Sequence, residues 1–213
     1  MTNAFNGAFN GDEFAENTKA LLSVYGNILL AIAKSSIEHG LKNNKPMKIN
    51  PTSIPEELNN IGASFVTLKK NGELRGCIGT PEAWQELAVD VAQNAYRAAF
   101  SDPRFMPLGM NETDELRISI SVLSPTIPIT INSEQELLSS LRPGVDGLII
   151  QDGPMRALFL PQVWKQLPDP KDFLSHLKQK AGMGGSHFSP TFKAERFIVE
   201  ETKADWGEIL PLQ

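Results

Sequence analysis

A single cysteine, Cys77, lies close to an arginine in the segment 74–80, Leu-Arg-Gly-Cys-Ile-Gly-Thr. Because side chains alternate between the faces of a strand, Arg75, Cys77 and Gly79 are predicted to share one face. Leu74, Gly76 and Ile78 are predicted to share the opposite face. This spacing places the guanidinium about 7 Å from the thiol along the strand. A nearby cation favours the thiolate, the nucleophilic form of cysteine, so this segment is the first candidate site.

The residues that follow the cysteine predict a helix start. Thr80, Pro81 and Glu82 supply a capping hydroxyl, a first-turn proline and an acid, and the helix is expected to run to about Phe100. Its positive end also favours a thiolate. Gly76 and Gly79 remove side-chain bulk on either side of the thiol, which lets a ligand or another backbone come close.

Two interpretations of Cys77 remain open at this stage. Free cysteine is often a buried, small apolar residue, and the residue types alone favour that interpretation. A reactive or ligand-contacting cysteine is the alternative. No activating base is identifiable among His39, His176 and His187. Their sequence contexts predict a helix end, a packed helical face and a glycine-rich loop.

A second polar pair, Asp102 and Arg104, flanks Pro103. The two side chains are expected to pair, either bracing a turn or supplying polar groups to a cleft near Cys77. The sequence contains no motif for other common kinds of site. One cysteine without paired histidines does not make a closed structural zinc site, and neither a phosphate-binding loop nor a nucleophile elbow is present. We therefore expect no metal and no cofactor.

The elements that must position these residues are predicted from hydrophobic periodicity. Two hairpins are expected, one across Asn71-Gly72 joining 64–70 to 73–78, the other across Asp152-Gly153. Helices are expected over 13–39, with Gly40 as the stop, and over 133–141, and short ones from Pro161 and Pro170. Strands are expected over 116–122 and 195–201. The order favours an α+β fold with a mainly antiparallel sheet, packed helices and two subdomains sharing one core.

Bulk properties describe an ordinary globular chain of 213 residues with 41% hydrophobic and 21% charged residues. Residues 1–12 contain a tandem Ala-Phe-Asn-Gly repeat and are predicted to be a flexible tail, which leaves 13–213 as one domain. The net charge of −5 gives no basic footprint for nucleic acid. No apolar run reaches the roughly 20 residues of a membrane span, and the single cysteine fits a reducing, cytoplasmic setting.

Six ordered blocks of this sequence resemble the AMMECR-domain family, whose prokaryotic members are called AmmeMemoRadiSam system protein A. The first block is Gly-Glu-Leu-Arg-Gly-Cys-Ile-Gly-Thr over 72–80 and the second is Asp-Pro-Arg-Phe-Met-Pro-Leu over 102–108. The others lie in 116–125, 144–150, 157–164 and 173–182. The resemblance spans about 14–202, and it implies an α+β fold with two subdomains and a cleft near the cysteine motif.

The resemblance also implies a context for function. The prokaryotic members of this family are similar in context to partners of a Memo-like protein and of a radical-SAM protein. We therefore predict a binding or accessory component that holds a small molecule or a peptide segment. Its expected site residues are Arg75, Gly76, Gly79, Asp102 and Arg104. The alternative is an enzyme that uses Cys77 as nucleophile or redox centre.

Overall fold

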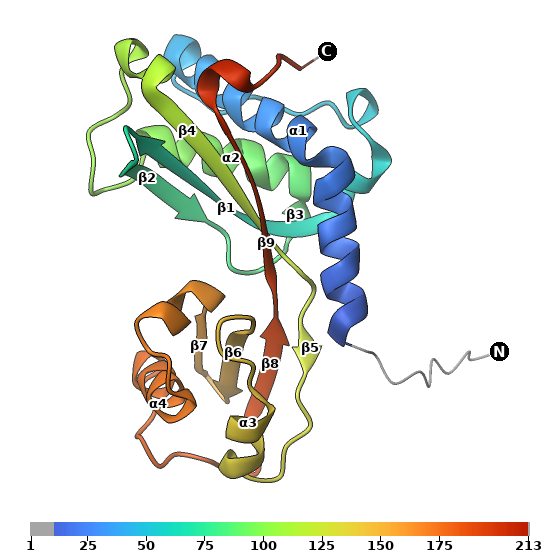
Figure 1. The fold of residues 1–213 in the computed structure, drawn as a ribbon, viewed down its shortest axis with the longest axis vertical. Helices are drawn as coiled ribbons and strands as arrows, with labels where there is room; N and C mark the ends of the chain where they lie inside the picture. Colours follow the sequence, from blue (N-terminus) through green and yellow to red (C-terminus); the bar gives the residue numbers. More distant parts are fainter. Residues whose placement is uncertain (1–10, 213) are drawn as a thin grey trace, which may run out of the picture.

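The computed structural model describes residues 11–212, which form two lobes, one above the other in Figure 1. The upper lobe contains α1 (Gly11–Asn43), β1 (Ile61–Lys70), β2 (Glu73–Gly79), β3 (Gln85–Glu86), α2 (Leu87–Phe100), β4 (Leu116–Leu123) and β9 (Val199–Asp205). The lower lobe contains β5 (Ile127–Pro128), α3 (Glu134–Ser140), β6 (Gly147–Asp152), β7 (Met155–Phe159), α4 (Pro170–Lys180) and β8 (Lys193–Phe197). Short 3₁₀ helices, among them η3 (Met110–Glu115), η4 (Pro161–Lys165) and η5 (Trp206–Glu208), complete the connections.

The upper sheet has the strand order β2-β1-β4-β9, with β3 paired to the start of β1. Helices α1 and α2 pack on one face of this sheet (Figure 1). The predicted hairpin is confirmed, because Asn71 and Gly72 both have positive φ between β1 and β2, as a tight two-residue turn requires. Alternate residues of β1 and β4, such as Val66, Leu68 and Ile118, bury their side chains against the helices.

The lower sheet has the order β5-β8-β6-β7, and α3 and α4 cover one of its faces. Phe173 of α4 stacks on Trp164 of η4 with ring centroids 3.7 Å apart, so the helix and the segment after β7 share one apolar cluster. The second predicted hairpin and the predicted helix starts at Pro161 and Pro170 are confirmed. All strand pairs recorded within residues 11–212 are antiparallel, which confirms the α+β fold with antiparallel sheets.

Two chain crossings join the lobes, and they are hydrogen-bonded to each other. The first runs from β4 to β5 through Ser124, and the second runs from β8 to β9 through Ile198. Ser124 N–H donates to Ile198 O, and Ile198 N–H donates to Ser124 Oγ, both at 3.0 Å. A small apolar cluster of Ala63, Leu123, Ile149 and Phe197 fills the junction. In place of one shared core, each lobe has its own apolar cluster, and the small cluster at the junction connects the two.

Several predicted element boundaries differ from the structure. Helix α1 does not end at Gly40 but continues to Asn43, because the absent side chain of Gly40 leaves room for the rings of Tyr96 and Phe100. The predicted flexible tail lies outside the described residues except for Gly11 and Asp12, which begin α1. The predicted single strand 195–201 is divided at Ile198 into β8 and β9, one in each sheet.

Helix α1 is the one described helix long and apolar enough to cross a membrane, judged over Glu16–Asn43 by length and composition alone. Half of the apolar window in that segment is buried within the protein. Leu29, Ile32 and Ile37 have no exposed surface, and they pack in the same apolar cluster as α2 and the upper sheet. This burial is that of a core helix.

Candidate functional site

Cys77 lies on β2, the edge strand of the upper sheet, opposite Thr67 of β1. Its neighbour Gly76 faces α2, so the thiol points to the sheet face that the helices do not cover. Cys77 is partly exposed, and its Sγ is 3.3 Å from the hydroxyl of Thr67, which donates to it. The sulfur is therefore not sealed in the core.

Asp102 and Arg104 are brought together at the outer edge of β2, as the sequence predicted. Arg104 Nη2 lies 2.6 Å from Asp102 Oδ2, and Asp102 is nearly buried with 4% of its surface exposed. Asp102 Oδ2 accepts the N–H of Cys77 at 2.8 Å, while Arg104 Nη2 donates to the Cys77 carbonyl at 3.3 Å. The pair thus satisfies the backbone of the edge strand in the way a neighbouring strand would.

The electrostatics of this pair follow from its geometry. The Arg104 guanidinium holds the pKa of Asp102 well below its usual range, and the Cys77 N–H contributes in the same direction. Asp102 correspondingly raises the pKa of Arg104. Both groups stay charged at neutral pH, so neither can take a proton from the nearby thiol.

Arg75 is not on the face that the sequence predicted, because β2 contains a bulge. Gly76 pairs with Leu68 and Leu74 pairs with Lys69, which leaves Arg75 as the extra, unpaired residue. The bulge also turns Leu74 to the face opposite Gly76, and 41% of Leu74 is exposed. The predicted shared face of Arg75 and Cys77, and the predicted shared face of Leu74 and Gly76, are therefore wrong.

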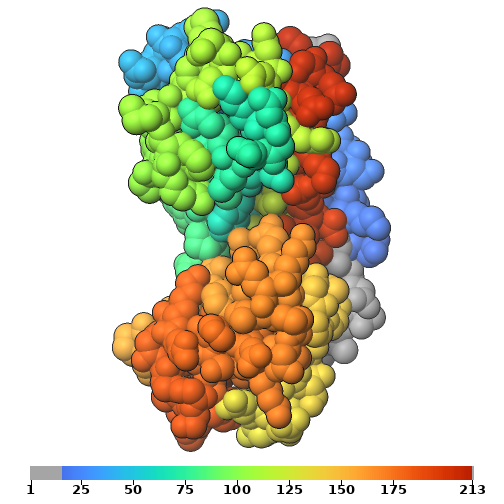
Figure 2. Space-filling view, turned by 60° about the vertical axis from the view of Figure 1, so that its left-hand side comes forward, coloured from blue at the N-terminus to red at the C-terminus, as the bar shows by residue number. Residues whose placement is uncertain are grey.

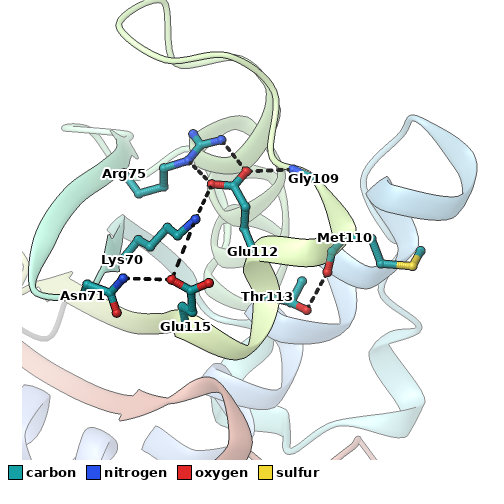
Figure 3. A network of polar contacts seen from close by, with 8 residues as sticks. All are labelled: Lys70, Asn71, Arg75, Gly109, Met110, Glu112, Thr113 and Glu115. Carbon is teal, nitrogen blue, oxygen red and sulfur yellow. Dashed lines mark hydrogen bonds and ion pairs between the residues drawn. The ribbon is translucent and has the colours of Figure 1, made fainter.

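The guanidinium of Arg75 is held by Glu112 of η3 (Figure 3). Its Nε and Nη2 donate to the two carboxylate oxygens at 3.0 and 2.9 Å. Lys70 adds a further contact to Glu112 and one to Glu115. These hydrogen bonds lower the pKa of Glu112 to about 2 and raise that of Arg75. Arg75 thereby fastens the hairpin to the 109–115 segment, a partner that the sequence pattern did not single out.

Gly76 and Gly79 are required by protein packing. A Cβ on Gly76 would lie 2.1 Å from the carbonyl oxygen of Ala98, so the strand is pressed against the backbone of α2. A Cβ on Gly79 would lie 2.1 Å from the ring of Phe65, which covers that glycine. Of the two alternatives predicted from the glycines, the close approach of another backbone is found at Gly76, while the Phe65 ring fills the space beside Gly79.

The helix predicted from Pro81 begins instead at Leu87, ten residues after the cysteine. Residues 85–86 form β3 against β1, and a buried network explains why the chain stays extended. Asp90 Oδ2 accepts from both the N–H and the hydroxyl of Ser64, and its Oδ1 accepts from Gln85. The expected effect of a helix N-terminus on the thiol is therefore absent, and Trp84, just before β3, is 66% exposed.

None of the three histidines contacts Cys77. His187 lies in the lower lobe, 2.6 Å from the carboxylate of Asp152, which also accepts from the hydroxyls of Ser189 and Thr191. Because Ser189 donates to the carboxylate rather than to His187, the group is not arranged as a catalytic triad. Within residues 11–212, no group of three or more His, Cys, Asp or Glu side chains is arranged to hold a metal ion.

A pocket of about 350 Å³ lies between the lobes, and its lining includes Pro81, four residues after Cys77. Figure 2 shows a waist between the two lobes, and the pocket lining combines residues 81–83 of the upper lobe with Arg156 of β7 in the lower lobe. Glu82 and Arg156 form an ion pair across this junction. Sequence reasoning missed Glu82, Arg156 and Glu195 as pocket residues. The only available signal was the alternating pattern of the two lower strands.

The AMMECR1 family model matches residues 30–202. This chain belongs to the AMMECR1 family. A protein of Methanothermobacter thermautotrophicus is 38% identical over 177 residues, covering 82% of this chain and 92% of that protein. A protein of Thermofilum pendens is 36% identical over 202 residues, covering 84% and 92%.

The AMMECR1 fold is also found in a solved structure. An uncharacterized protein of Pyrococcus horikoshii superimposes with a TM-score of 0.71 at 32% sequence identity, covering 85% of this chain and 92% of its own. Membership of the AMMECR1 family and the α+β fold are thus established together. The names of these relatives assign no activity.

Proposed function

We propose that this AMMECR1 protein is a binding or accessory component that acts with Memo-like and radical-SAM proteins. Its binding surface is the region near Cys77 where β2 and segment 80–84 meet the lower lobe. One observation carries the proposal: the charged groups beside Cys77 are engaged with the backbone and with each other. Asp102 and Arg104 hold the backbone of Cys77, and Glu112 holds Arg75. This arrangement shapes a rigid surface instead of activating the thiol.

The same region presents an aromatic side chain suited to a partner. Trp84 lies directly after the pocket-lining residues 81–83 and is 66% exposed. Exposed tryptophans are frequent among the residues that dominate binding energy at protein interfaces. We therefore expect Trp84 to contribute to partner binding, while Cys77 contributes little.

The experiment measures binding of the purified chain to a Memo-like protein and to a radical-SAM protein from the same organism. Trp84→Ala should weaken binding by about tenfold or more, as for a typical interface anchor. Val24→Ala, at an equally exposed position on α1, is the matched control and should bind as wild type. Cys77→Ser should also bind as wild type. Absence of binding to both proteins, or equal binding by Trp84→Ala, contradicts the proposal.

The enzyme alternative has one observation in its favour, the partial exposure of the Cys77 thiol. It requires that the thiol react much faster than an ordinary cysteine at neutral pH. Mass spectrometry of the native protein after timed treatment with iodoacetamide between pH 6 and 9 measures this. Rapid labelling at pH 6 would support the alternative, and labelling only after denaturation would exclude it.

A further inference from the structure

The pocket between the lobes has apolar walls from both lobes. Ala63 and Leu123 come from the upper sheet, and Ile149 and Phe197 come from the lower sheet. Its volume of about 350 Å³ lies within the range of pockets that hold small organic molecules. The charged groups in this lining are Glu82, Arg156 and Glu195. What the pocket selects therefore depends on how these three charges are balanced.

Glu82 and Arg156 neutralise each other. They form a direct ion pair between segment 81–83 and β7, and both side chains are partly exposed, at 59% and 33%. This pair links the two lobes and leaves no net charge to attract a ligand. The third charged group has no such partner.

Glu195 is a carboxylate without a counter-ion in this pocket. It lies in the middle of β8, beside Ile149 in the register of the lower sheet, and is partly buried. No described residue lies within hydrogen-bond or ion-pair distance of its carboxylate. The adjacent Arg196 points to the opposite face, where it donates to the carbonyl of Ser140. Lys193 shares the face of Glu195 but does not line the pocket.

A partly buried carboxylate against apolar walls loses hydration when the pocket is filled, unless the occupant supplies a positive charge. An ammonium or guanidinium group would form a charge-assisted hydrogen bond with Glu195. The apolar remainder of such a ligand would cover Ile149, Leu123 and Phe197. An anionic ligand would meet an unpaired carboxylate and would have to displace Glu82 from Arg156.

We propose that this pocket binds an organic cation, with an ammonium or guanidinium on an apolar stem, and that Glu195 is the residue that anchors it. The cation belongs either to a small molecule or to a lysine or arginine side chain of a partner. This inference rests on the proposed binding function, for which it names the ligand chemistry.

The test uses calorimetry or ligand-detected NMR with n-hexylammonium, hexanoate and hexan-1-ol as probes of equal length. Wild type should bind n-hexylammonium saturably and in preference to the other two. Glu195→Gln should weaken that binding by about tenfold, the loss of one charge-assisted contact. Glu73→Gln, at an exposed position of β2 outside the pocket, is the matched control and should have no effect. Equal binding to Glu195→Gln, or preference for hexanoate, overturns the proposal.

A second variant guards against a change of pocket shape. Arg156→Gln frees Glu82 and so adds a negative charge to the lining, and n-hexylammonium binding should stay equal or become tighter. A loss as large as that of Glu195→Gln would overturn the anchoring role of Glu195. N-acetyl-lysine methylamide, compared with n-hexylammonium, distinguishes the two sources of the cation by which binds more tightly. Partner binding is measured separately, so the accessory role and the cation site can fail independently.

Discussion

At the scale of single residues, charged side chains near Cys77 form ion pairs that hold neighbouring segments together. Arg75 and Glu112 are only 13% and 18% exposed, and Nη1 of Arg75 is buried without a hydrogen-bond partner. Such a guanidinium depends on the carboxylate for compensation, because an unpaired buried charge is costly. The hairpin edge should therefore be sensitive to loss of Glu112.

Glu112→Gln should lower the free energy of unfolding by about 2–3 kcal/mol, since it leaves the Arg75 charge without a counter-ion. Urea denaturation at pH 7 measures the change. Glu115→Gln is the matched control, because Glu115 is 45% exposed and its ion pair with Lys70 should be worth under about 0.5 kcal/mol. An equal loss of unfolding free energy in the two variants would show that the ion pair of Glu112 with Arg75 stabilises the fold no more than the exposed pair of Glu115 with Lys70.

The same pair predicts a pH dependence. The pKa of Glu112 is lowered to about 2 by Arg75, against roughly 4.3 in an unfolded chain. A lowered pKa stabilises the fold above the unfolded value, and that contribution is lost as pH falls toward the folded value. The difference between wild type and Glu112→Gln should therefore be constant above about pH 5 and shrink as the pH falls from roughly 4 to 2. A difference that grows with acid would contradict the assignment.

A second cluster of side chains holds the loop after α4 to Asp152 at the end of β6. Hydrogen bonds from Ser189, Thr191 and His187 lower the pKa of Asp152 to about 2. These hydrogen bonds should stabilise the loop fully above about pH 4, the usual pKa of a free aspartate, and their contribution should be lost as the pH falls toward about 2. Amide hydrogen exchange of residues 187–192, expressed as protection factors that correct for the pH dependence of intrinsic exchange and compared between pH 5 and pH 2, measures this. Asp152→Asn should show the faster exchange already at pH 5.

At the scale of elements, the close contact between β2 and α2 depends on Gly76. The Ala98 carbonyl occupies the place of a side chain there, and backbone cannot move aside as a flexible side chain can. The signature glycine thereby sets the distance between the helix and the strand that carries Cys77.

Gly76→Ala should destabilise the protein by about 3 kcal/mol or more, because one extra methyl group must push α2 off the sheet. Thermal unfolding followed by circular dichroism measures the loss. Gly184→Ala is the matched control, since a Cβ there meets nothing within 4 Å. If both variants unfold at the wild-type temperature, the helix does not press on this strand.

At the scale of the whole molecule, the relation between the lobes is fixed by two short crossings. Ser124 is 6% exposed, and its hydroxyl accepts the Ile198 N–H in the middle of the junction. The pocket between the lobes includes Ser124 and residues on both sides of it. Its shape therefore depends on this crossing.

Ser124→Ala should cost about 1–3 kcal/mol, because it leaves the buried Ile198 N–H without an acceptor. Chemical denaturation measures the cost, and faster hydrogen exchange of the Ile198 amide locates it. Ser139→Ala, at an exposed hydroxyl of α3, is the matched control and should change stability little. An unchanged Ile198 exchange rate in Ser124→Ala would show that water replaces the hydroxyl without loss.

The sequence by itself determined most elements, the antiparallel fold, the family and the pairing of Asp102 with Arg104. These follow from local signals, such as the Asn71-Gly72 turn and the alternation over 116–122. Only the tertiary structure decided the direction of Arg75, the start of α2 at Leu87 and the division of the last strand at Ile198. The first is caused by the bulge in β2, the second by the buried hydrogen-bond network around Asp90, and the third by the passage of the chain from one sheet to the other. All three depend on contacts between segments that are distant in the chain. Hydrophobic periodicity describes only residues that are close in the sequence, so it cannot predict those contacts. For the same reason it cannot predict the pocket that brings Glu82, Arg156 and Glu195 together.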